Sequence, residues 1–362
     1  MPHHAGRRDA LRAELRELEL DALLVTNLLN VRYLTGFTGS NAALLVHADG
    51  EDGTLFSTDG RYLTQSAQQV PDLERVIDRP CDLTLAARAA KDGVRRAGFE
   101  SHHVTVEGLD GLTAAAEGVE LVRAPGLVEE LRLVKDDAEI DALRMACAAA
   151  DRALVGLIEH GGLRPGRTER EIARELESRM LDHGADGPSF ESIVAAGANS
   201  AVPHHRPTDA VLHSGDFVKL DFGALVDGYH SDMTRTLVLG KAADWQLELY
   251  ELVTTSQAAG RAALRVGASV REVDAASRDV IEKAGHGEHF LHGLGHGVGL
   301  EIHEAPALSR TGDGTLFAGM AVTVEPGVYL SGKGGVRIED TLVVRENAPE
   351  LLTLTTKELV VV

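Results

Sequence analysis

The first third of the chain alternates between helical and extended patterns of apolar residues. Between residues 7 and 20, leucines recur at helical spacing among arginines and glutamates, which predicts an amphipathic helix. Short apolar runs typical of buried strands follow at residues 22–25, 42–46, 54–56 and 104–106. Helix-like stretches such as 83–97 separate these runs, so we expect a small mixed α/β domain at residues 1–123. A Pro-Gly connector then predicts a linker over residues 124–135.

The second part of the chain, residues 136–362, opens on a long helical pattern and then repeats itself. Residues 163–172 match residues 264–273 at a constant offset of 101. In both copies a Thr or Ser is followed three residues later by Glu, which predicts a capping box at the start of a helix. The repeat therefore predicts two similar halves within one domain.

A second repeat places acidic residues at the ends of predicted strands. Residues 215–223 resemble residues 319–327 at an offset of 104, and the two strands end on Asp221 and Glu325. The β-rich run that follows each strand carries another acid, Asp232 in the first half and Glu339 in the second. Burying an unpaired carboxylate in such stretches costs several kcal/mol, so we expect cations to neutralise these acids.

Composition narrows the class of protein. A chain of 362 residues with 44% hydrophobic content suggests two domains, and Cys81 and Cys147 fit no metal-binding or redox spacing. A net charge of −20 opposes binding to phosphate backbones, so we expect no nucleic-acid partner. The charged N-terminus lacks the apolar stretch of a signal peptide, and no apolar window is long enough to span a membrane. We therefore expect a cytoplasmic protein without a membrane partner.

The segment 292–304 contains three histidines among four glycines. A dinucleotide-binding loop is disfavoured, because Val298 stands where that fingerprint requires glycine and no clear strand precedes it. A zincin helix is disfavoured as well, since position 307 is Ala rather than His and Pro306 would break the helix.

This segment resembles the signature of the Xaa-Pro peptidases, the aminopeptidase P and prolidase branch of the pita-bread metallopeptidases. The four strand-end acids stand in the family's order, and the similarity covers roughly residues 130–362. The resemblance implies an α+β pita-bread (creatinase/aminopeptidase) fold with a pseudo-twofold repeat. It also implies that the smaller α/β domain before it is creatinase-like.

The resemblance further implies a site for two divalent metal ions. Asp232 and Glu339 would bridge the metals, Asp221 would chelate one of them, and His296 and Glu325 would complete the other. A bridging hydroxide would attack the scissile carbonyl, and Glu325 would shuttle the proton. Four carboxylates with one imidazole suit Mn²⁺ best, with Co²⁺ or Zn²⁺ as alternatives.

Further roles come from the same resemblance. His204, in the segment 199–204, and His303 precede matching strands of the repeat and are expected to stabilise the tetrahedral intermediate from opposite halves. His292 would line the proline pocket, while Arg337 and Tyr229 would support the bridging acids. We count these last three as candidate substrate-binding residues.

The expected activity is that of an Xaa-Pro aminopeptidase, which acts on peptides with proline at the second position. An Xaa-Pro dipeptidase (prolidase) is the alternative. A metal-free creatinase-like hydrolase and a non-enzymatic pita-bread binding protein also remain open, although both would be expected to have lost metal ligands that this chain retains. A methionine aminopeptidase would lack both the leading domain and the 292–304 signature. We also expect a homodimer.

Overall fold

The computed structural model describes residues 4–362, and the chain divides into two compact units after Arg132. Each unit has its own β-sheet structure and its own buried apolar clusters, as independently packed domains do. Within the described range, no helix is long and apolar enough to cross a membrane.

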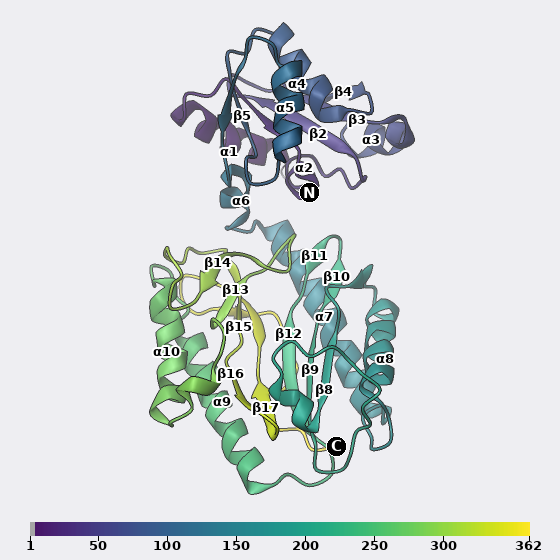
Figure 1. Ribbon diagram of the computed structural model, residues 1–362, viewed down its shortest axis with the longest axis vertical. Helices are drawn as coiled ribbons and strands as arrows, with labels where there is room; N and C mark the ends of the chain where they lie inside the picture. Colours follow the sequence, from purple (N-terminus) through teal and green to yellow (C-terminus); the bar gives the residue numbers. More distant parts are fainter. Residues whose placement is uncertain (1–3) are drawn as a thin grey trace. The chain divides into compact units, whose positions relative to one another are not determined.

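The first unit is built on a six-stranded mixed sheet (Figure 1). In sheet order the strands are β4 (Glu74–Ile77), β3 (Leu55–Thr58), β2 (Ala42–His47), β1 (Ala22–Val25), β5 (Arg96–Phe99) and β6 (Glu120–Arg123). The helices are α1 (His4–Glu17), α2 (Leu28–Thr35), α3 (Leu63–Gln69), α4 (Cys81–Lys91), α5 (Val106–Ala115) and α6 (Leu127–Arg132). Strand β1 pairs antiparallel with β2 and parallel with β5, and all four of its residues are buried. Both faces of the sheet are therefore covered at its centre.

Two features of this unit differ from the sequence-based expectation. The run 104–106 is not a strand, because the Thr105 side chain accepts a hydrogen bond from the Gly108 amide at 3.0 Å and begins helix α5. The expected linker contains helix α6, which belongs to the first unit. Its Arg132 is buried and donates to Asn30 Oδ1 at 3.0 Å.

The second unit contains four long helices around several small sheets. The helices are α7 (Asp137–Glu159), α8 (Glu169–Asp182), α9 (Asp244–Ala263) and α10 (Val270–Lys283). The strands of the first half are β7 (Gly187–Pro188), β8 (Ile193–Ala196), β9 (Phe217–Phe222), β10 (Ala224–Val226), β11 (Tyr229–His230) and β12 (Met233–Val238). Those of the second half are β13 (Gly295–Gly297), β14 (Glu304–Leu308), β15 (Ala321–Val324), β16 (Gly327–Leu330), β17 (Gly334–Arg337), β18 (Asp340–Val343) and β19 (Glu350–Leu351).

The two halves of this unit repeat the same order of elements. In each half two helices precede a strand, a hairpin and a return strand, and helices α8 and α10 lie on opposite sides of the strands (Figure 1). Both expected capping boxes form: Thr168 pairs with Glu171 at the start of α8, and Ser269 with Glu272 at the start of α10. Each half has its own apolar cluster, one against α7 and α8 and the other against α9 and α10. The α+β fold with an internal repeat is therefore confirmed.

The halves join where their return strands meet. The Glu339 amide donates to the Thr234 carbonyl at 3.1 Å, and Thr341 Oγ1 donates to the Asp232 carbonyl at 2.8 Å. These contacts bring β12 beside the start of β18. Since a strand-end acid stands on each side of this junction, the duplication itself gathers the acids at the middle of the unit.

The duplicated caps give a test of the repeat. Thr168→Ala and Ser269→Ala should each lower the free energy of unfolding by about 1 kcal/mol, because each removes the side-chain acceptor for an N3 amide. The losses should add in the double variant, since the caps share no partners. Urea denaturation measures both. Thr168→Ser and Ser269→Thr keep a hydroxyl and serve as controls, and an alanine loss no larger than theirs would contradict the assigned caps.

Candidate metal and active site

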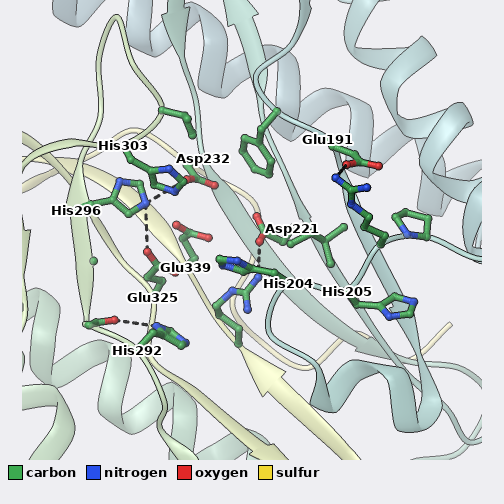
Figure 2. A pocket seen from close by; sticks show the side chains of 18 residues that line it. Glu191, His204, His205, Asp221, Asp232, His292, His296, His303, Glu325 and Glu339 are labelled. Carbon is green, nitrogen blue, oxygen red and sulfur yellow. Dashed lines mark hydrogen bonds and ion pairs between the residues drawn. The ribbon is translucent and has the colours of Figure 1, made fainter. Parts of the chain in front are cut away.

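Backbone pairing places the acids of each half at strand ends. Asp221 is the penultimate residue of β9 and lies opposite Thr234 in the β9–β12 pair, while Asp232 immediately precedes β12. In the second half Glu325 follows β15, and Glu339 precedes β18. All four carboxylates line one cavity together with His296 (Figure 2).

Three of these side chains come close enough to share an ion. Asp232, His296 and Glu339 each offer a ligand atom, and these atoms lie within 4.8 Å of one another. His296 Nε2 also lies 3.5 Å from Asp232 Oδ2 and 3.3 Å from Glu325 Oε1. A nitrogen facing several carboxylate oxygens at these distances is the donor set of a divalent cation.

The tautomer of His296 fits this assignment. Its Nδ1 lies 3.0 Å from the Gly297 carbonyl oxygen, which can only accept, so Nδ1 carries the proton. Burial lowers the pKa of His296 and favours the neutral ring. Nε2 therefore points a lone pair at Asp232 and Glu325, an arrangement that a cation between them would stabilise.

The carboxylates have the electrostatics of a cation site. Burial, together with neighbouring carboxylates, raises the pKa of Asp232 and Glu339 well above the ordinary values. Burial likewise raises the pKa of Glu325 to about 7, although the Arg337 guanidinium opposes the shift. Asp221 Oδ1 is buried without a hydrogen-bond partner among residues 4–362. The residues present therefore fit a metal site.

Arg337 organises the floor of the site. Its side chain is 2% exposed, and Nη2 donates to Asp221 Oδ2, leaving Oδ1 as the free oxygen. Its Nε donates to Thr234 Oγ1 at 3.0 Å, and that hydroxyl in turn donates to Glu339 Oε2 at 2.6 Å. One guanidinium thus orients two acids, one directly and one through a hydroxyl.

A hydrogen-bond chain also orients His292. Arg337 Nη1 donates to the Tyr329 hydroxyl at 2.8 Å, and that hydroxyl lies 2.8 Å from His292 Nε2. His292 Nδ1 lies 2.8 Å from the Gly293 carbonyl, so Nδ1 donates and Nε2 accepts from the tyrosine. Burial and nearby Arg337 lower the pKa of His292 to about 3, while burial raises that of Tyr329 to about 12. His292 is therefore a neutral ring that has used both nitrogens.

Neither Tyr329 nor Tyr229 lines the cavity, but Tyr329, which the sequence analysis did not single out, bonds to His292 and Arg337, which do. The Tyr229 hydroxyl donates to Glu139 on α7 at 3.0 Å, and Tyr229 is not among the residues that line the cavity. The Tyr229 hydroxyl is therefore directed to α7, and its expected support of the bridging acids stays a prediction. Strand alternation could have indicated Tyr329, since Glu325, Gly327 and Tyr329 follow one another at a spacing of two.

The cavity has a volume of about 420 Å³, within the range of small-molecule and peptide sites. His204 and His303 both line it, and in Figure 2 they lie on different sides of the carboxylates. The His303 ring stands edge-on to His296, with centroids 4.5 Å apart. Apolar side chains complete the wall: Phe190, Ile193, Pro207 and Ile302. The structure thus brings together every site residue expected from the sequence except Tyr229.

A duplicated α+β unit with buried carboxylates converging on one imidazole defines a pita-bread metallopeptidase. Residues 141–346 match metallopeptidase family M24, and residues 7–134 match the creatinase/prolidase N-terminal domain. The chain belongs to metallopeptidase family M24.

Similar proteins and structures cover the whole chain. A structure described as an Xaa-Pro dipeptidase from Bacillus anthracis has a TM-score of 0.95 and 39% identity, and the alignment covers 99% of this chain and 100% of that protein. A structure of an X-Pro aminopeptidase from Thermotoga maritima has a TM-score of 0.89 and 33% identity, covering 98% and 99%. An Xaa-Pro dipeptidase from Pyrococcus furiosus is 34% identical over 95% of this chain and 96% of its own length. Both unit folds are therefore those of this family.

The raised carboxyl pKa values predict how the metal-free protein responds to pH. A carboxyl whose pKa is raised on folding contributes its full stability below the unfolded-state pKa of about 4, and loses it as pH rises through the folded-state value. Metal-free protein should therefore be less stable at pH 7.5 than at pH 5, because the pKa of Glu325 is about 7 and those of Asp232 and Glu339 are also raised. Adding Mn²⁺ at pH 7.5 should restore stability.

Urea denaturation of chelator-treated protein at the two pH values provides the measurement. Glu325→Gln, which replaces one titrating acid by a neutral amide of similar shape, should show a smaller difference between the two values. A metal-free protein that becomes more stable between pH 5 and pH 7.5 would show that these carboxyls do not repel one another as described.

Proposed function

We propose that this protein is an Xaa-Pro aminopeptidase that removes the residue preceding a proline at the second position of a peptide. The observation that carries the proposal is the convergence of four buried carboxylates and His296 on a cavity whose walls hold His204, His292 and His303. The Xaa-Pro specificity of the similar proteins supports it.

The acids and His296 would hold two divalent cations. We assign Asp232 and Glu339 to both ions, Asp221 to one, and His296 and Glu325 to the second. The oxygen-rich donor set favours Mn²⁺, with Co²⁺ and Zn²⁺ as alternatives. When bound, such ions polarise a carbonyl and lower the pKa of water, the chemistry that amide hydrolysis requires.

The remaining residues have distinct tasks in this proposal. Glu325 holds the proton taken from water at its carboxylate and passes it to the leaving nitrogen. His204 and His303 donate hydrogen bonds to the oxygen of the tetrahedral intermediate from the two halves. His292, neutral and with both nitrogens bonded, offers the proline ring an apolar face. Arg337 keeps Asp221 and Glu339 in place.

The preference for longer peptides or for dipeptides depends on which protein groups contact the substrate beyond its proline. A dipeptidase needs a cation for the carboxylate next to the scissile bond. Of the two arginines that line the cavity, Arg337 is buried against Asp221, whereas Arg206 is 84% exposed and forms only a surface ion pair with Glu191 at 3.2 Å. The use of Arg337 by Asp221 favours the aminopeptidase, while the dipeptidase names of similar proteins favour the prolidase.

A metal-free hydrolase and a non-enzymatic binding protein have less support than either peptidase. Neither has need of five metal-ligating side chains, and all five line one cavity in this protein. The homodimer and the cytoplasmic location stay predictions.

Substitution of the acids assigned to both ions tests the metal site. Asp232→Ala or Glu339→Ala should remove both metals and abolish hydrolysis of an Xaa-Pro peptide, whereas His296→Ala should mainly weaken one site. His204→Ala should keep both metals and lower turnover by roughly 10²- to 10³-fold, because it removes a donor to the intermediate. Metal content and kcat are measured on the same samples.

The control for this series is Glu191→Gln, which changes an exposed acid at the cavity rim and should leave the metal content unchanged. Two bound metals in the Asp232→Ala protein, or full activity after chelation, would refute the two-metal proposal.

Comparing substrates of two lengths tests the aminopeptidase assignment. If the rim arginine stays paired with Glu191, kcat/KM for an Xaa-Pro-Yaa tripeptide should equal or exceed that for the Xaa-Pro dipeptide. The two peptides should share the first residue, so that only the chain beyond proline differs. A dipeptide preference of tenfold or more would establish the prolidase activity instead.

A further inference from the structure

Two buried side chains bind the loop that carries His204, one on each side of this residue in the sequence. Residues 204–207 form part of the cavity wall, between the short helix η2 (Gly197–Ala201) and strand β9. The His204 side chain is exposed to the cavity and lies near the carboxylates in Figure 2. Two fully buried ionisable side chains, Lys219 and Glu169, bind this loop on either side of His204.

Lys219 holds the chain just before His204. It lies on β9, two residues before Asp221, and is 0% exposed. Its Nζ donates to the carbonyl of Val202 at 2.6 Å and to that of Pro203 at 3.2 Å. Burial and nearby Arg337 lower its pKa. A neutral amine still has two N–H bonds, so both contacts survive loss of the charge.

Glu169 holds the chain around and after His204. It is 0% exposed, and its Oε1 accepts from the Ala196 amide and Asn199 Nδ2, both at 2.9 Å. Its Oε2 accepts from His205 Nε2 at 2.8 Å and from the Thr208 amide and hydroxyl at 3.0 and 2.7 Å. Burial alone would raise the pKa of Glu169, but these hydrogen bonds outweigh burial, lower the pKa and hold the carboxylate ionised.

The anchors act on the neighbours of His204 and leave its ring free. The contacts of Lys219 end at Pro203, and those of Glu169 resume at His205. Arg337 Nη1 adds a donor to the Pro203 carbonyl at 3.2 Å, which ties the loop to the group that orients Asp221. The backbone that carries His204 is therefore fixed relative to the acids, while its imidazole remains available to a substrate.

We propose that Lys219 and Glu169 are positioning residues for His204, holding its backbone at the distance from the acids that the tetrahedral intermediate requires. The inference rests on the proposed function of His204. Displacing a catalytic group by about 1 Å can cost on the order of 10²-fold in rate. Releasing either anchor should therefore reduce turnover through His204 while the metal ligands stay in place.

A double-mutant cycle tests this. Lys219→Met removes both hydrogen bonds to the loop at similar side-chain length. Glu169→Gln replaces one of two acceptor oxygens by an NH2 donor, which then faces the donors that the oxygen had bound. Each should lower kcat on an Xaa-Pro peptide by at least about tenfold, with KM changed less and two metals still bound. In the His204→Ala background the same substitutions should lower kcat by less than about twofold, since the group they position is gone.

Hydrogen exchange supplies a readout that does not depend on activity. Lys219→Met should speed amide exchange in residues 199–208 and leave helix α9 unchanged. If Lys219→Met does not fold, Lys219→Gln, which keeps one pair of donors, takes its place with a smaller expected loss of kcat.

Asp151→Asn is the matched control, because Asp151 is a buried carboxylate that accepts from the Leu354 and Thr355 amides at 2.7 and 2.9 Å, in a segment that does not line the cavity. It should destabilise the protein without lowering kcat tenfold.

The outcomes separate the two proposals. Equal losses of kcat in both backgrounds, or unchanged exchange in residues 199–208, overturn the positioning role while the proposed function stands. If His204→Ala retains full kcat, both the positioning role and the oxyanion role of His204 are overturned. A wild-type protein without Xaa-Pro hydrolysis refutes the proposed function and, with it, the role of the anchors in catalysis. Faster exchange in the Lys219→Met protein would then still show that Lys219 anchors the loop.

Discussion

The repulsion among buried carboxylates is the constraint on which the second unit depends. Asp232 and Glu339 are buried beside one another, and their pKa values are raised because burial and neighbouring acids both disfavour ionisation. Such a cluster can ionise only if positive charge enters it. The fold keeps Asp232 and Glu339 close together, because the duplicated halves meet beside the strands that follow these two acids.

The buried cation Arg337 offsets part of the repulsion among the carboxylates but does not neutralise them all. Arg337 binds one oxygen of Asp221 and reaches Glu339 through a hydroxyl, so each acid is oriented but keeps an oxygen for a metal. The same guanidinium extends through Tyr329 to His292. Metal ligands and the proposed proline-facing wall therefore share one rigid support, and rigid support is what an accurately placed site requires.

The histidines and the acids that line the cavity lie on different kinds of backbone structure. His204 and His303 are exposed to the cavity and lie on loops, whereas the acids lie in strands or directly at their ends. Buried Lys219 and Glu169 give the His204 loop a fixed course that its own residues would not maintain. An exposed catalytic imidazole on a loop can be accurate when the loop is bonded on both sides, because its backbone then loses little freedom when substrate binds.

The sequence by itself determined the repeat and the capped helices, because these follow from local spacing. It also predicted the proposed ligand set through the resemblance to a known family. The tertiary structure alone decided that Tyr329 links Arg337 to His292, and that residues 104–106 lead into a helix instead of forming a strand. It also revealed Lys219 and Glu169 as anchors. Hydrogen-bond partners of buried groups depend on which segments fold together, and periodicity along the chain carries no information about that choice.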